Sequence, residues 1–155
     1  MTADAQHDLV LERIFDAPPE KVFKAWTDPA ILPRWFAPRP FTTPKVEIDL
    51  KPGGVFNTLM MSEDGTEYSN PGVVLEVVPN RRLVTTDAFG PGWVPTGQPF
   101  MVAELTFEPL GGGRTKYTAR ARHWTAEAKA QHEQMGFHAG WGQCADQLAE
   151  VLATL

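Results

Sequence analysis

Hydrophobic residues follow two different periods in this chain, one typical of β-strands and one typical of an α-helix. Between residues 9 and 123, apolar and polar positions alternate in short segments that are separated by turn residues. From about residue 125 to residue 155, apolar residues instead recur every three or four positions, which predicts one long amphipathic helix. The apolar stripe of this helix comprises Phe137, Trp141, Cys144, Leu148, Val151, Leu152 and Leu155.

The alternating segments predict an antiparallel sheet with two short helices after its first strand. Pro18 and Pro19 suit the first turn of a helix. Asp28-Pro29 ends that helix and begins a second one, which reaches Phe36. Pro33 inside this second segment predicts only one or two distorted turns. No helical pattern separates the later strands, which favours an antiparallel meander. We expect strands at residues 9–15, 45–50, 56–60, 72–78, 83–89, 101–108 and 115–123.

The long helix must bury its stripe, and the sheet is the only large apolar partner that the sequence offers. The prediction is therefore an α+β fold in a single domain over residues 1–155, a length that suits one core. On the last strand, Ala119 and Ala121 share a face with Tyr117 and His123. Small side chains beneath the helix leave room for a ligand. A tightly filled core is the alternative, because Met and Phe fill a core equally well.

Composition excludes several partners. The formal net charge is −5, which gives no overall attraction to nucleic acid or to anionic membrane surfaces. No apolar run approaches the roughly 18 residues of a membrane span, and the first residues lack the apolar core of a signal peptide. Cys144 is the only cysteine, so no internal disulfide forms. We therefore expect a cytoplasmic protein.

The side chains expected to contact a ligand come from the first helix, the sheet, one long loop and the last helix. His123 and His138 are its predicted polar contacts, since histidine suits hydrogen bonding and proton transfer; exposed structural histidines are the alternative. Trp93, in the proline- and glycine-rich loop at residues 90–99, is expected to cover the entrance or to plug one end of the core. The predicted contacts are Trp26, Phe56, Met60, Trp93, Met101, Phe107, Tyr117, His123, Phe137, His138 and Trp141.

Motifs for metals, cofactors and covalent catalysis are not found. The spacing of His123, His132 and His138 does not follow a recognised metal motif, so we predict no metal. Ser62 and Ser69 do not lie in a G-x-S-x-G setting. The glycine pairs and runs are turns rather than phosphate-binding loops, and we predict no cofactor.

Several phrases resemble one family in their order along the chain. They are residues 13–29 (RIFDAPPEKVFKAWTDP), Trp35-Phe36, residues 49–54 (DLKPGG), Asp64-Gly65, residues 72–79 and Gly140-Trp141. This sequence resembles domains related to the activator of heat-shock-protein-90 ATPase, in the START-like, helix-grip superfamily. The resemblance implies a curved antiparallel sheet of six to seven strands, wrapped around the C-terminal helix with a hydrophobic cavity between them.

Three functions are compatible with this resemblance. The leading hypothesis is binding of a small hydrophobic ligand, lipid- or polyketide-like, in that cavity. One alternative is an enzyme of the cyclase or isomerase type, in which His123 or Tyr117 moves a proton. The other is a protein-binding chaperone cofactor. The fold alone does not decide among them, and the sequence leaves a protein partner and a homodimer open.

Overall fold

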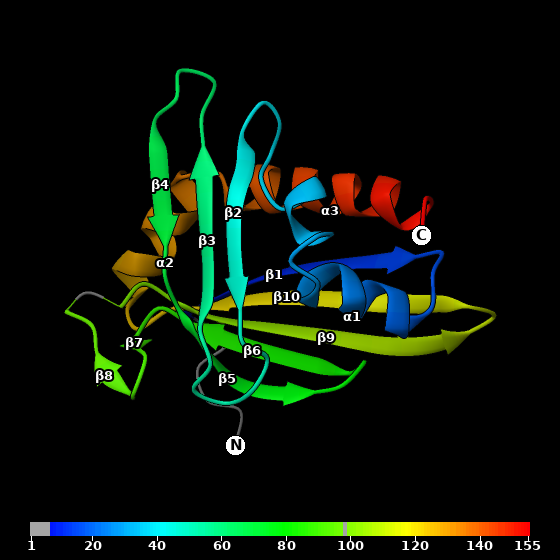
Figure 1. The fold of residues 1–155 in the computed structure, drawn as a ribbon, viewed down its shortest axis with the longest axis horizontal. Helices are drawn as coiled ribbons and strands as arrows, with labels where there is room; N and C mark the ends of the chain where they lie inside the picture. The colour runs from blue at the N-terminus through cyan, green and yellow to red at the C-terminus, as the bar shows by residue number, and fades with distance from the viewer. Residues whose placement is uncertain (1–6, 98) are drawn as a thin grey trace.

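Five strands form the largest antiparallel sheet in the computed structural model, which describes residues 7–97 and 99–155. Their order across the sheet is β1-β10-β9-β6-β5 (Figure 1). The hairpin of β9 and β10 lies at its centre, and β1 pairs antiparallel with β10. In chain order the bounds of β1, β5, β6, β9 and β10 are Asp8–Phe15, Val73–Val78, Arg82–Thr86, Val102–Gly111 and Arg114–Arg122.

The remaining long strands form a separate three-stranded sheet in the order β2-β3-β4. The α+β class with antiparallel strands is confirmed, but the strands do not make one continuous sheet as the sequence predicted. The turn before β3 is held to β5 instead: Gly53 N donates to Val74 O over 2.7 Å, and Val74 N donates to Gly54 O over 2.8 Å. The bounds of β2, β3 and β4 are Thr42–Ile48, Phe56–Met61 and Glu67–Asn70.

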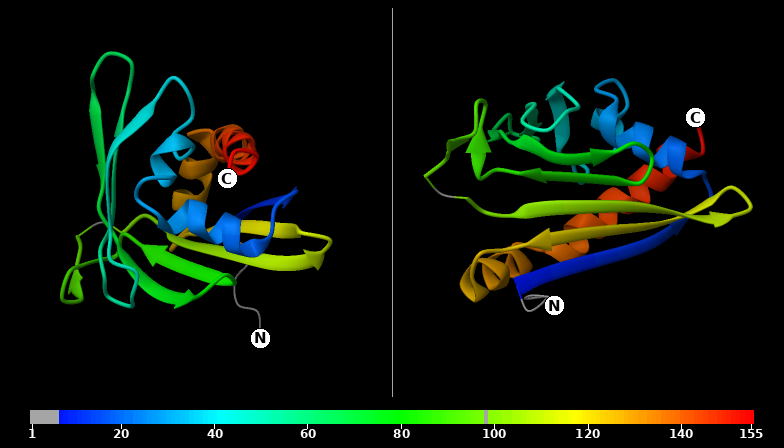
Figure 2. Two further views of the ribbon diagram at one scale, coloured as in Figure 1. Left: turned by 45° about the vertical axis from the view of Figure 1, so that its right-hand side comes forward. Right: turned by 90° about the horizontal axis from the view of Figure 1, so that it is seen from below.

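Only glycine fits at the corner between the two sheets. A Cβ atom on Gly54 would lie 2.0 Å from the carbonyl oxygen of Asp49, far inside van der Waals contact. This corner turns the second sheet away from the first. The left view of Figure 2 shows the sheets as two arms of an L, with helices α1 and α3 inside the angle.

The two short segments after β1 differ in length. Helix α1, Pro19–Thr27, begins with proline at its first position and buries Val22, Phe23 and Trp26, as the sequence predicted. The second predicted helix is reduced to one 3₁₀ turn, η2 (Leu32–Arg34). Proline has no N–H group to extend a helical ladder, and Pro33 lies inside this segment.

The prediction of one unbroken C-terminal helix is wrong. The chain forms helix α2, Ala126–Gln134, and then helix α3, Phe137–Leu152. Gly136 separates them with a φ of +97°, a left-handed conformation that glycine adopts readily. The hydroxyl oxygen of Thr125 caps α2 by accepting a hydrogen bond from Ala128 N over 3.0 Å.

Helix α3 buries most of the predicted stripe. Phe137, Leu148, Val151 and Leu152 are buried, whereas Leu155 follows the helix and is 38% exposed. The stripe also contains a polar residue that the sequence pattern did not reveal, Gln147, which is 3% exposed. Its amide donates to the carbonyl oxygens of Trp35 and Ala37 over 2.9 and 2.8 Å, and its Oε1 accepts from Arg39 N over 3.0 Å. A fully bonded amide can be buried at little net cost, and this one fastens α3 to the segment after η2.

The central hairpin of the large sheet alternates as predicted. Ala103, Leu105 and Phe107 on β9 and Tyr117, Ala119 and Ala121 on β10 are all buried beneath the helices. Their neighbours in the sequence point to the other face, where charged side chains gather. The small residues of β10 thus lie directly against the core.

The two glycines at the start of α3 are expected to respond in opposite directions to alanine. Gly140→Ala should raise the free energy of unfolding by about 0.5–1 kcal/mol, because alanine favours a helix and nothing lies within 4 Å of its added Cβ. Gly136→Ala should lower it by about 1 kcal/mol, because an L-residue is strained at that φ. Denaturant unfolding measures both; a destabilised Gly140→Ala protein would contradict this account of the helix.

Candidate functional site

Aromatic side chains from α1, β3, β9 and β10 fill one end of the angle between the sheets. The indole Nε1 of Trp26 donates a hydrogen bond to the hydroxyl oxygen of Tyr117 over 3.1 Å. The ring centroids of Phe107 and Tyr117 lie 6.1 Å apart, and those of Trp26 and Phe56 lie 6.4 Å apart. All four residues are buried. These four predicted ligand contacts pack on one another, so a ligand reaches them only if they separate.

Tyr117 is held as a neutral phenol. Burial raises its pKa, and the hydrogen bond from Trp26 only partly opposes that rise. The hydroxyl therefore stays protonated at neutral pH and supplies no phenolate base. This setting argues against Tyr117 as the group that moves a proton.

A buried histidine pair lies where β10 leads into α2. Nε2 of His123 is 2.9 Å from Nδ1 of His132, and Nδ1 of His123 is 2.8 Å from the carbonyl oxygen of His7. His123 is 7% exposed and His132 is 6% exposed. The pair joins three separate segments: the residue before β1, the end of β10 and the middle of α2.

Aromatic rings surround this pair. The ring centroids of Phe100, Phe137 and Trp141 lie 4.8, 5.2 and 5.9 Å from that of His132. We call His123, His132, Phe100, Phe137 and Trp141 the histidine–aromatic cluster. Burial, together with the nearby His123, lowers the pKa of His132 to about 4, so this ring is neutral at pH 7. The cluster therefore places the uncharged ring of His132 among apolar rings.

The hydrogen-bond partner of His123 is His132, whereas His138, the other predicted polar contact, lies apart from this pair. His138 lies on α3, where its Nε2 is 3.3 Å from a carboxylate oxygen of Glu133; both side chains are at least half exposed. Sequence reasoning considered His132 only as a metal ligand. It missed this residue because α2 carries no apolar stripe, and His132 is the one residue of α2 that is buried.

Three further predicted contacts lie at partly exposed positions. Met101 and Trp141 are partly exposed and pack against the core. Met60, on β3, is also partly exposed. Each of these three residues is therefore partly accessible to solvent.

Trp93 lies elsewhere. It forms the tip of a two-stranded ribbon, β7 (Phe89–Gly90) with β8 (Val94–Pro95), and is 48% exposed. Its ring is edge-on to Phe89, with centroids 5.7 Å apart, and 3.1 Å from the position of a Cβ on Gly53. Among the described residues, no ring of the histidine–aromatic cluster contacts Trp93. The Trp93 ring instead covers the turn before β3.

A family model described as activator of Hsp90 ATPase homolog 1-like protein matches residues 16–153. The chain belongs to this family. The match confirms the resemblance that its sequence phrases carried.

Solved structures agree with the assignment. A protein from Nitrosomonas europaea is 38% identical, with a TM-score of 0.93 and 97% of each chain covered. The AHSA1 protein from Silicibacter pomeroyi is 27% identical, with a TM-score of 0.72, and the match covers 95% of this chain and 98% of that one. A protein from Chromobacterium violaceum is 26% identical, with a TM-score of 0.76 and 93% and 96% covered. These matches confirm the helix-grip fold. No functionally curated protein matches the chain.

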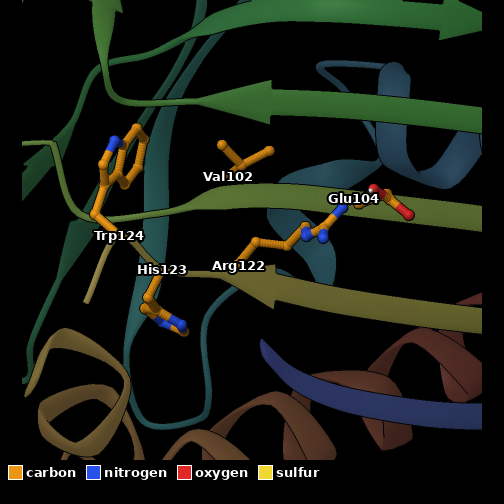
Figure 3. Close-up of a pocket in the computed structure, with 5 residues that line it drawn as sticks. All are labelled: Val102, Glu104, Arg122, His123 and Trp124. Atoms are coloured by element: carbon orange, nitrogen blue, oxygen red, sulfur yellow. Dashed lines mark hydrogen bonds and ion pairs between the residues drawn. The ribbon is translucent and has the colours of Figure 1, made fainter. Parts of the chain in front are cut away.

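Two hollows open on outward surfaces of this member of the activator of Hsp90 ATPase homolog 1-like family. One, of about 250 Å³, is lined by residues of the β2-β3-β4 sheet. The other, of about 290 Å³, is lined by Val102, Glu104, Arg122, His123 and Trp124. Figure 3 shows Trp124 and Val102 on one side of the sheet and the His123 ring pointing away from them. Apart from His123, neither hollow is lined by a predicted ligand contact.

Ion pairs neutralise the charges beside the larger hollow. The carboxylate oxygens of Asp8 lie 3.3 Å from a guanidinium nitrogen of Arg120 and 3.3 Å from one of Arg122. A second guanidinium nitrogen of Arg122 lies 3.5 Å from a carboxylate oxygen of Glu104. Arg82 contacts Glu104 over 3.2 Å and also pairs with Glu76, so three arginines meet three carboxylates here. Burial raises the pKa of Glu104, but the hydrogen bond and charge of Arg82 outweigh it and lower the pKa overall. The hollow therefore has no excess positive charge for an anion.

Other reactive groups offer little chemistry. Within residues 7–97 and 99–155, no group of three or more His, Cys, Asp or Glu side chains is placed to hold a metal ion. The thiol of Cys144 donates to the carbonyl oxygen of Phe36 over 3.1 Å, and burial raises its pKa to about 12. It is thus an unreactive thiol at neutral pH. In the described part of the chain, no helix is long and apolar enough to cross a membrane.

The stability of the protein should depend on pH through His132. Its pKa is lowered from 6.5 to about 4, so between these values the unfolded chain binds more protons than the folded one. The free energy of unfolding should fall by on the order of 3 kcal/mol as pH drops through this window. Urea unfolding at several pH values measures it, with His132→Phe as the control that removes this contribution. Parallel curves for the two proteins would contradict the prediction.

Removing the Tyr117 hydroxyl should destabilise the aromatic core. Tyr117→Phe leaves Trp26 Nε1 buried without its acceptor, which costs about 1–3 kcal/mol. Denaturant unfolding measures the loss. Tyr68→Phe is the matched control, because Tyr68 is 48% exposed and its change should be within about 0.5 kcal/mol. Equal effects of the two substitutions would refute the role given to this hydrogen bond.

Proposed function

We propose that the protein binds a small hydrophobic ligand, of lipid or polyketide type, between the five-stranded sheet and α3. The observation that carries the proposal is the histidine–aromatic cluster, in which a buried histidine pair lies against the rings of Phe100, Phe137 and Trp141. Apolar walls with a few placed polar atoms are typical of small-molecule sites. The helix-grip resemblance implies a ligand at this same place.

Entry of a ligand requires side-chain movement, because the deep aromatic residues are in contact with one another. Met101 and Met60 lie at partly exposed positions, and an unbranched thioether side chain changes rotamer easily. Trp141 is also partly exposed and packs against the core. In our proposal a ligand displaces these side chains and then contacts the histidine pair.

Ligand binding without catalysis is the form that the geometry supports best. A base must be able to hold a proton near the working pH, and a pKa of about 4 makes His132 a weak base at pH 7. Tyr117 stays protonated there.

The partly buried free thiol of Cys144 suits a reducing compartment, and we extend the proposal to a cytoplasmic location.

Native mass spectrometry after gentle purification tests the proposal. The expected result is a bound small molecule that organic extraction releases. A hydrophobic compound library should also raise the thermal unfolding midpoint, since a ligand that binds only the folded state stabilises it. Ligand-free protein that responds to no compound in the library would overturn the proposal.

Substitution of two tryptophans, one inside the proposed site and one outside it, tests where the ligand binds. Trp141→Ala should weaken binding of any compound found in that screen by about tenfold, through lost apolar contact. Trp124→Ala is the matched control: this indole is 49% exposed on the other side of the sheet, and its loss should leave affinity unchanged. Isothermal titration calorimetry measures both. A loss confined to Trp124→Ala would place the ligand in the outward hollow instead.

A further inference from the structure

The carbonyl oxygen of His7 determines which nitrogens of the histidine pair donate hydrogen bonds and which accept them. A backbone carbonyl oxygen only accepts hydrogen bonds, so the Nδ1 of His123, 2.8 Å from the carbonyl oxygen of His7, must donate. In a neutral imidazole the other nitrogen is then an acceptor. Nε2 of His123 therefore accepts from Nδ1 of His132 over 2.9 Å. His132 has thereby used its single proton, and its Nε2 carries a lone pair.

We propose that this Nε2 accepts a hydrogen bond from the ligand, so that the polar group of the ligand is a neutral donor such as the hydroxyl of an alcohol or phenol. The inference rests on the proposed function and specifies its ligand class. The carbonyl oxygen of His7 fixes the tautomer of His123, and His123 fixes that of His132. His123 is thus a positioning residue, and His132 is the residue that contacts the ligand.

The same geometry disfavours a ligand with an ionised carboxylate. Such a group carries no proton to donate, and its charge loses hydration among the rings of Phe100, Phe137 and Trp141. A protonated His132 would reverse this preference by supplying a second N–H donor. Its lowered pKa keeps the ring neutral at pH 7. The histidine–aromatic cluster therefore selects hydroxyl compounds over fatty-acid-like ones.

Three probes of similar shape test the selection: 2-naphthol, 2-methoxynaphthalene and 2-naphthoate at pH 7.5. The naphthol should bind at least about tenfold more tightly than the methyl ether, which lacks the donor, and the naphthoate should bind most weakly. In the His123→Phe protein, His132 loses the partner that holds its proton on Nδ1. The ratio of naphthol to methyl-ether affinity should then fall to within about threefold of one. Trp124→Ala is the control and should keep the wild-type ratio.

Long-range ¹H–¹⁵N NMR of the imidazole rings tests the tautomer directly in the wild-type protein. We expect His132 protonated at Nδ1 and unprotonated at Nε2 at pH 7. This measurement keeps the inference falsifiable if His123→Phe does not fold. A proton on Nε2 of His132 overturns it.

The binding outcomes separate this inference from the proposed function. Equal affinities for naphthol and its methyl ether, or tightest binding of the naphthoate, overturn the hydroxyl selection and leave ligand binding intact. If none of the three probes binds, the inference fails. In that case native mass spectrometry and the library screen decide whether the proposed function fails with it.

Discussion

Burial of α3 against the concave side of the large sheet is the constraint on which the rest of the structure depends. Phe137, Leu148, Val151 and Leu152 must leave water, and α3 packs against β1, α1 and η2. Alanines at 119 and 121 let the helical layer come close. Gln147 then fixes how α3 lies, because its amide has to satisfy three backbone groups that follow η2 or precede β2.

The break at Gly136 links this packing to the candidate site. In a continuous helix, residues 126–134 would lie on the same axis as α3. The left-handed glycine instead gives α2 a direction of its own, and α2 brings His132 within hydrogen-bonding distance of His123. The pair also fastens the segment before β1 through the carbonyl oxygen of His7. One backbone feature therefore brings the polar atoms of the cluster together.

The two ends of the angle between the sheets differ chemically. At one end, Trp26 and Tyr117 satisfy each other, and aromatic rings fill the space around them. At the other, the histidine pair lies beside the partly exposed Trp141. Membership in the activator of Hsp90 ATPase homolog 1-like family fits a ligand-binding or partner-binding role. In our proposal the histidine end supplies a directional contact for a ligand, whereas the aromatic end mainly stabilises the fold.

Local pattern determined much of this protein. Alternation along β9 and β10, the proline-initiated α1 and the stripe of α3 are each set by neighbouring residues, and all appear as predicted. The sequence phrases shared with the family also predicted the helix-grip fold. Among the site residues, the sequence brought Trp26, Phe107, Tyr117, Phe137 and His123 to the buried side correctly.

Tertiary structure decided the remainder. The division into two sheets depends on Gly54 meeting Asp49 across a turn, and the place of Trp93 depends on its contact with Gly53, a residue 40 positions earlier. His132 gives no sequence signal, because its polar helix has no periodic face. Its burial comes from His123, just after β10, and from the rings of Phe100, Phe137 and Trp141. Sequence periodicity reports which face of one element avoids water. It does not report which polar side chains two separate elements bring into contact, and that contact defines the candidate site.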